Sequence, residues 1–190
     1  MSKSSGRLSC LVACACESAR LAHGVAHLLW MRHDQSLNVI TTEAGSQPRA
    51  SLTDLGRERA WRAARSLNTA GISVIYASSA VRAQQTADIV ASHLQLPVVM
   101  TADLAEVWLG SKEGATDAAT LRHTADVLRA WLGDGRLDDR VANGETSHDV
   151  ANRVTSVLRR IGETHVDRPA LEIEYLASLT TGINALCGNG

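Results

Sequence analysis

Strand-like and helix-like segments alternate along most of the chain, and this alternation limits the fold more than any other feature. The predicted strands cover residues 25–31, 72–78, 96–101 and 170–176, and the predicted helices cover 51–71, 79–94, 116–135 and 146–162. A strand that reaches its neighbour through a helix pairs with it in parallel, and the helices then cover both faces of the sheet. We therefore predict a three-layer α/β/α fold with a mostly parallel central sheet.

The length of 190 residues is enough for one good hydrophobic core, so we assign residues 25–190 to a single domain. Residues 1–24 show no periodicity and are predicted to be an N-terminal extension without fixed structure. The short apolar run in "GRLSCLVACAC" leaves a secretion signal open as an alternative for this extension. The spacing of the cysteines favours reduced thiols, which indicates a cytoplasmic protein.

The charges of the chain nearly cancel, with 19 Lys and Arg against 20 Asp and Glu. This balance argues against nucleic acid and anionic membranes as partners, because it offers no overall positive field. No segment is long enough to cross a membrane as a helix. Any anion site must therefore be local, and the basic residues are mostly Arg, which grips phosphate with paired donors.

Polar side chains follow the predicted strands at their carboxyl ends. Arg32 and His33 follow the first strand, Ser78 and Arg82 follow the second, and Glu106 comes shortly after the third. Ligands of open α/β sheets bind beyond this edge, so these residues are expected to meet there. Two guanidinium groups can hold a phosphate dianion, a neutral imidazole can attack its phosphorus, and a carboxylic acid can protonate the leaving oxygen.

Purely structural interpretations exist for several of these and neighbouring residues. Ser78 could simply begin a turn, and Glu145 could be an acid at the start of a helix, where the helix dipole favours it. Arg153 stands four residues after Asp149, a spacing that predicts a surface ion pair along one helix. His165 is expected to be exposed.

The chain resembles the histidine phosphatases, also called the phosphoglycerate-mutase-like superfamily, through five motifs in the expected order. These motifs are "LWMRHDQSLN", "LTDLGRERA", "IYASSAVRAQQTA", "LAEVWLGSKEG" and "GETSHDVANR". Together they cover about residues 26–160. The resemblance implies a phosphoglycerate-mutase-like α/β fold.

The same resemblance implies roles for individual residues. His33 would be the nucleophile that carries the phosphoryl group, and Glu106 would donate the proton to the leaving oxygen. Glu145 would help to orient the site. The phosphate-binding residues would be Arg32, Asn38 and Arg82. The implied reaction uses a small phosphorylated substrate and needs neither a metal ion nor a cofactor.

The sequence departs from the family pattern at two places. Asp34 stands where the family has a glycine after the nucleophile, and this carboxylate would repel phosphate unless it points away or pairs with an arginine. The family's last motif, a strand that ends in [ST]-H-G-G, is not recognisable. Its second histidine aligns with Leu179, followed by Gly182, or has His165 as its remnant, and we expect the fold to be shortened at its C-terminal end.

Three functions are compatible with these patterns. The leading hypothesis is a metal-independent phosphatase that hydrolyses phosphomonoesters through phosphohistidine. The missing second histidine favours an alternative, a catalytically impaired relative that binds a phosphorylated ligand or a protein. A mutase is a further alternative, although mutases carry a long insertion before the "GET" motif that this chain lacks. The sequence leaves a homodimer open.

Overall fold

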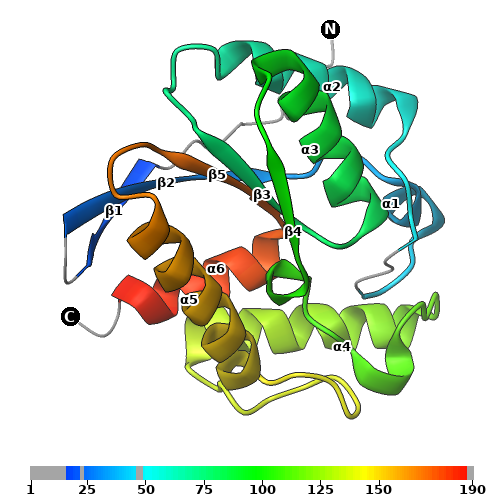
Figure 1. Cartoon of the computed structure of the whole chain (residues 1–190). Helices are drawn as coiled ribbons and strands as arrows, with labels where there is room; N and C mark the ends of the chain where they lie inside the picture. The colour runs from blue at the N-terminus through cyan, green and yellow to red at the C-terminus, as the bar shows by residue number, and fades with distance from the viewer. Residues whose placement is uncertain (1–15, 22–23, 46–48, 188–190) are drawn as a thin grey trace, which may run out of the picture.

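The computed structural model describes residues 16–21, 24–45 and 49–187. Within these residues the sheet has five strands in the order β1-β2-β5-β3-β4 (Figure 1). Their bounds are Cys16–Leu21 for β1, Gly24–Arg32 for β2, Val74–Ser78 for β3, Val98–Thr101 for β4 and Ala170–Glu174 for β5. The pairs β2–β5, β5–β3 and β3–β4 are parallel, whereas β1 pairs antiparallel with β2 at one edge. The predicted mostly parallel sheet is confirmed.

Helices lie on both faces of this sheet, so the three-layer prediction is also confirmed (Figure 1). Helices α2 and α3 cover one face, and α5 and α6 cover the other, with α4 beyond them. The α-helices are α1 (Leu37–Thr41), α2 (Asp54–Ser66), α3 (Val81–Leu94), α4 (Ala118–Arg129), α5 (Ser147–Thr164) and α6 (Leu176–Cys187). Shorter turns of helix occupy Ala102–Leu104, Gly110–Lys112 and Ala130–Asp134.

Two apolar clusters fill the space between the layers, because successive side chains of a strand point to opposite faces. Leu171 and Ile173 of β5 pack with the side chains of α2 and α3. Leu28 and Trp30 of β2 pack on the opposite face with α5. Glu172 and Glu174 of β5 also point to this second face, where both are fully buried. Two acidic side chains therefore extend from the central strand of the sheet into the protein interior.

The ends of several elements differ from the sequence-based predictions. Thr53 caps α2, since its Oγ1 accepts a hydrogen bond from Gly56 N at 3.0 Å. The helix ends at Ser66, before the predicted stop at Gly71. Helix α3 begins after Ala80, which is its N-cap and supplies no side-chain bond, so it starts later than the predicted range 79–94.

The predicted extension over residues 1–24 contains one element that the sequence pattern does not indicate. Cys16–Leu21 form β1, which pairs with β2 along Gly24–Leu29. Residues 1–15 and 22–23 lie outside the described residues, and so does the apolar run that resembles a secretion signal.

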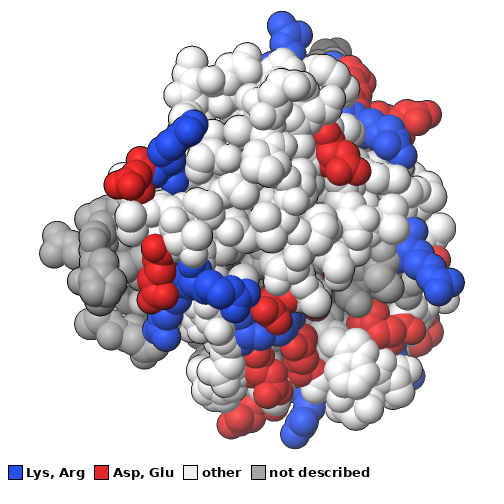
Figure 2. Space-filling model, viewed as in Figure 1, with Lys and Arg blue, Asp and Glu red and all other residues white. Residues whose placement is uncertain are grey.

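Charged side chains are mixed on the surface. On the face shown in Figure 2, charged groups of both signs surround a large uncharged area, and several acidic groups gather along its lower edge. In the described ranges, none of the helices combines the length and the apolar character that crossing a membrane requires.

Candidate active site

His33 directly follows β2 and points into the protein, where only 6% of it is exposed. Its backbone N–H donates to Glu174 O on the adjacent strand β5 at 3.3 Å, and this bond fixes the residue at the carboxyl edge of the sheet. Its Nδ1 lies 2.7 Å from Asp34 O. A carbonyl can only accept, so Nδ1 carries the proton and Nε2 keeps its lone pair.

The imidazole of His33 is held in its neutral form. Burial, together with the charges of Arg82 and Arg32, lowers the pKa of His33 from 6.5 to about 4 against the opposing bond to Asp34 O. A neutral ring with its lone pair on Nε2 is the form that can act as a nucleophile.

Arg82 approaches this same nitrogen. It belongs to the first turn of α3, is 1% exposed, and donates from Nε to His33 Nε2 at 3.3 Å. Burial lowers the pKa of Arg82, whereas the carboxylates of Glu106 and Glu113 raise it. A guanidinium remains charged under such conditions, so a fixed positive charge lies beside the nucleophile.

The other two predicted phosphate-binding residues lie in the segment around His33, and the structure gives an electrostatic link to His33 for Arg32. The charge of Arg32 lowers the pKa values of both His33 and Glu106, which places this exposed arginine close to them. Asn38 lies on α1, where its Oδ1 accepts a hydrogen bond from Ser36 Oγ at 2.7 Å. This bond orients the amide group of Asn38 in the segment that follows the nucleophile.

Glu106 follows the short helical turn after β4 and is brought into the same site. Burial raises its pKa, although the backbone N–H groups of Val107 (2.9 Å) and Ser178 (3.1 Å) and the charges of Arg153 and Arg32 oppose the rise. Both backbone bonds go to Oε1, so Oε2 is the oxygen that can carry a proton. A carboxyl group with a raised pKa is suited to donate that proton.

Glu145 and Arg153 form the support of Glu106. Arg153 Nε and Nη2 bind the two carboxylate oxygens of Glu145 at 2.7 and 2.9 Å. Its Nη groups also donate to the carbonyls of Asp103, Ala105 and Glu106. Glu145 thus orients the loop that carries Glu106, and the predicted ion pair between Arg153 and Asp149 is wrong.

Asp34 is neutralised by an arginine that the sequence does not point to. Its Oδ1 lies 3.2 Å from Arg59 Nη1 on α2 and also accepts from the N–H of Gln35 at 2.6 Å. The carboxylate of Asp34 therefore faces α2 and pairs with an arginine, one of the two arrangements in which it would not repel phosphate. The loop is held tightly there, because a Cβ on Gly56 would meet Gln35 O at 2.2 Å.

Tyr175, which sequence reasoning missed, occupies the position directly after β5. Its ring contacts the His33 imidazole at a centroid distance of 4.9 Å. Leu179, the position that aligns with the family's second histidine, lies on α6 and packs against the apolar core. The sequence signal that could have identified Tyr175 is an aromatic residue near the carboxyl end of the predicted strand 170–176, because the site lies at that edge of the sheet.

His165 is not brought to this site. It caps the C-terminal end of α5, and its Nε2 lies 3.0 Å from Tyr76 Oη on β3. The segment after it joins the amino ends of the strands, where Pro169 O accepts from Ser73 N. The candidate supporting role of His165 therefore has no structural basis.

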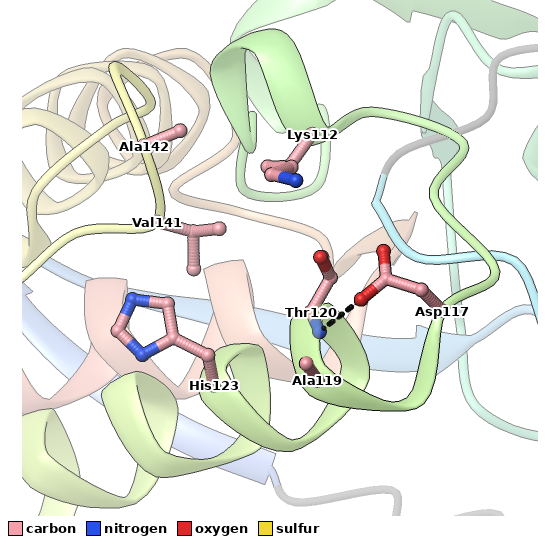
Figure 3. A pocket seen from close by; sticks show the side chains of 7 residues that line it. All are labelled: Lys112, Asp117, Ala119, Thr120, His123, Val141 and Ala142. Atoms are coloured by element: carbon pink, nitrogen blue, oxygen red, sulfur yellow. Dashed lines mark hydrogen bonds between the residues drawn. The ribbon is translucent and has the colours of Figure 1, made fainter.

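A hollow of about 310 Å³ lies beside α4 (Figure 3). It is lined by Lys112, Asp117, Ala119, Thr120, His123, Val141 and Ala142. Lys112, which lines the hollow, is followed in the sequence by Glu113, and the charge of Glu113 raises the pKa of Arg82. The hollow is therefore connected to the site through these two adjacent residues. In the part of the chain that the structure describes, no three His, Cys, Asp or Glu residues gather as metal ligands would.

Comparisons with known proteins identify a family that the chain matches. The family model described as "Histidine phosphatase superfamily (branch 1)" matches residues 28–173. The probable phosphoglycerate mutase GpmB of Proteus mirabilis is 30% identical over 67% of this chain. The chain spans 59% of the length of that relative.

Two further comparisons involve phosphatases. The glucosyl-3-phosphoglycerate phosphatase of Mycolicibacterium vanbaalenii is 28% identical over 85% of this chain and 76% of its own length. A solved mycobacterial glucosyl-3-phosphoglycerate phosphatase in complex with VO3 superimposes with a TM-score of 0.69 at 25% identity, covering 82% of this chain and 79% of that one.

Proposed function

Because the chain belongs to the histidine phosphatase superfamily, we propose that it hydrolyses phosphomonoesters through a phosphohistidine formed at His33. The observation that carries this proposal is the state of His33. Its Nδ1 is bonded to a carbonyl, its Nε2 keeps a lone pair, and Arg82 lies at Nε2. Nucleophile and anion-binding cation are thus directed at one point.

The first chemical step would transfer the phosphoryl group to the protein. His33 Nε2 attacks phosphorus, the bond to the ester oxygen breaks, and Arg82 gives up its bond to Nε2 to bind the phosphoryl oxygens. Glu106 gives its proton to the departing alkoxide, so the alcohol leaves neutral. The raised pKa of Glu106 supports this role, because the group must hold a proton near neutral pH.

The second step would return the site to its starting state. Water attacks the phosphorus of phospho-His33, the P–N bond breaks, and Glu106 takes back a proton from the water. Inorganic phosphate then leaves. The sum is one ester and one water converted into one alcohol and one phosphate, and no metal ion takes part in these steps.

The substrate class follows from the same groups. Two arginines beside a neutral imidazole suit a phosphate monoester dianion, and the proton donor suits an alcohol leaving group. We propose a small phosphorylated substrate and leave the alcohol unspecified. Two of the relatives compared above bear the name of a phosphatase, which favours hydrolysis over a mutase reaction.

The test measures hydrolysis of p-nitrophenyl phosphate in the presence of EDTA. We expect the unaltered protein to turn over and His33→Ala to lose at least about 1,000-fold in kcat. The exposed His148 provides the matched control, and His148→Ala should retain the full rate. A second readout is acid-labile labelling of the protein by a radioactive phosphate ester, which His33→Ala should abolish.

Two results would refute the hydrolase. Equal rates from the unaltered protein and His33→Ala would show that another group or a contaminant performs the reaction. Phosphate binding without turnover would favour the binding module. The 6% exposure of His33 and the tyrosine beside it would then explain why no turnover occurs.

A further inference from the structure

Tyr175 contacts both of the groups that would hold a phosphoryl group. Its ring meets the His33 imidazole edge to face at an interplanar angle of 68°, and the guanidinium carbon of Arg82 lies 4.7 Å above the ring centre. Only 3% of Tyr175 is exposed. The nucleophile and the cation at its nitrogen therefore share one aromatic neighbour.

The hydroxyl of Tyr175 is accompanied by a second hydroxyl. Ser78 ends β3, which pairs directly with β5. Its hydroxyl interacts with the hydroxyl of Tyr175 and lowers the pKa of that group, although burial raises it more. Both oxygens are buried, and apart from this interaction with each other neither has a hydrogen-bond partner among the described residues. Buried polar atoms are nearly always hydrogen-bonded in folded proteins, so such a pair beside a nucleophile indicates a ligand.

The chemistry of the pair fits an anion. Burial raises the pKa of Tyr175, so its hydroxyl keeps its proton and remains a donor over the whole neutral range. A serine hydroxyl is likewise a donor at every pH. Two neutral donors and a guanidinium can bind three phosphoryl oxygens without adding a negative charge.

We propose that Tyr175 and Ser78 bind the phosphoryl group by donating hydrogen bonds to its oxygens. This inference rests on the proposed function, because the ligand is the group transferred to His33. It adds a phosphoryl-binding tyrosine and serine to the arginines already described.

Tyr175→Phe is the decisive variant, since it keeps the ring contacts and removes one hydroxyl. Binding of inorganic phosphate by calorimetry and hydrolysis of p-nitrophenyl phosphate are measured separately. Loss of a hydrogen bond to a charged group predicts phosphate binding weaker by about 10- to 100-fold. Ser78→Ala should act in the same direction, and the effects of the two changes should not add, because the donors share one ligand.

The chain's other tyrosine supplies the control. Tyr76→Phe makes the same change on β3, where the hydroxyl that is removed faces His165. It should leave phosphate affinity unchanged. If Tyr175→Phe binds phosphate as well as the unaltered protein, the inference is wrong.

Two further results separate this inference from the proposed function. If Tyr175→Ala binds phosphate more tightly than the unaltered protein, the ring blocks access to His33. That result would overturn the inference and leave the proposed hydrolase intact. A protein that binds phosphate through Tyr175 but turns over no ester would refute the hydrolase and support the inference. Failure of the unaltered protein to bind phosphate would overturn the inference.

Discussion

Glu172 offers the largest predicted effect on stability. This residue of β5 is fully buried, its Oε2 accepts a hydrogen bond from Trp30 Nε1 at 2.9 Å, and its Oε1 has no bond to a described residue. Burial raises the pKa of Glu172 from 4.5 to about 8, against the smaller effect of the Trp30 bond. The carboxyl group is therefore protonated in the folded protein at neutral pH and ionised in the unfolded chain.

The sign of the effect on stability follows from this difference. The folded state binds the proton more tightly, so the free energy of unfolding is highest below pH 4.5 and falls as the pH rises toward 8. At pH 7 the loss is about 3 kcal/mol, since 2.5 pH units lie above the unfolded pKa and each contributes about 1.4 kcal/mol. Glutamine cannot ionise and keeps an acceptor for Trp30, so Glu172→Gln should recover this amount.

The assay is urea unfolding followed by tryptophan fluorescence at pH 4.5 and pH 7. Glu172→Gln should raise the free energy of unfolding by about 3 kcal/mol at pH 7 and by only a few tenths at pH 4.5. The control is Glu163→Gln on α5, which makes the same change at an exposed site. A stability gain that is equal at the two pH values, or a loss at pH 7, would refute the reasoning.

Two predictions concern activity. The neutral form of His33 should set the acid limb of kcat/KM near pH 4, because its pKa is lowered to about 4; a limb near 6.5 in a pH profile, after correction for the substrate's own ionisation, would contradict this. Arg153→Gln should lower kcat by about 10- to 100-fold by releasing the loop of Glu106. It should also move the alkaline limb to higher pH, because the charge of Arg153 lowers the pKa of Glu106, and an unmoved limb would contradict that link.

Much of the site can be predicted from the sequence because it depends on local patterns and one rule. The apolar run before His33 forms β2, and the pattern before Ser78 forms β3. Parallel pairing then places the ends of both strands at one edge, whatever the details of packing. The approach of Arg82 to His33 follows, since α3 begins three residues after β3 ends.

Pairs that join separate elements could not be predicted in this way. Helical spacing favours Asp149 as the partner of Arg153, but Asp149 is already used by the capping box of α5, where it accepts from Thr146 N at 2.9 Å. Arg153 is then available to Glu145, which precedes the helix. The partner of Asp34 is 25 residues away on α2, a separation at which no sequence period applies.

The acids of the site raise a further question of charge, because ionised carboxylates beside His33 would repel a phosphate dianion. Glu106 and Glu174 are both raised in pKa, mainly by burial, and the charge of Glu106 raises the pKa of Glu174 further. A raised pKa favours the neutral acid, and each acid that is neutral leaves the arginines as the dominant charges at the nucleophile. The same burial that makes Glu106 a proton donor thus preserves the positive potential of the site, whereas its proton loss at higher pH would remove the acid and weaken anion binding together.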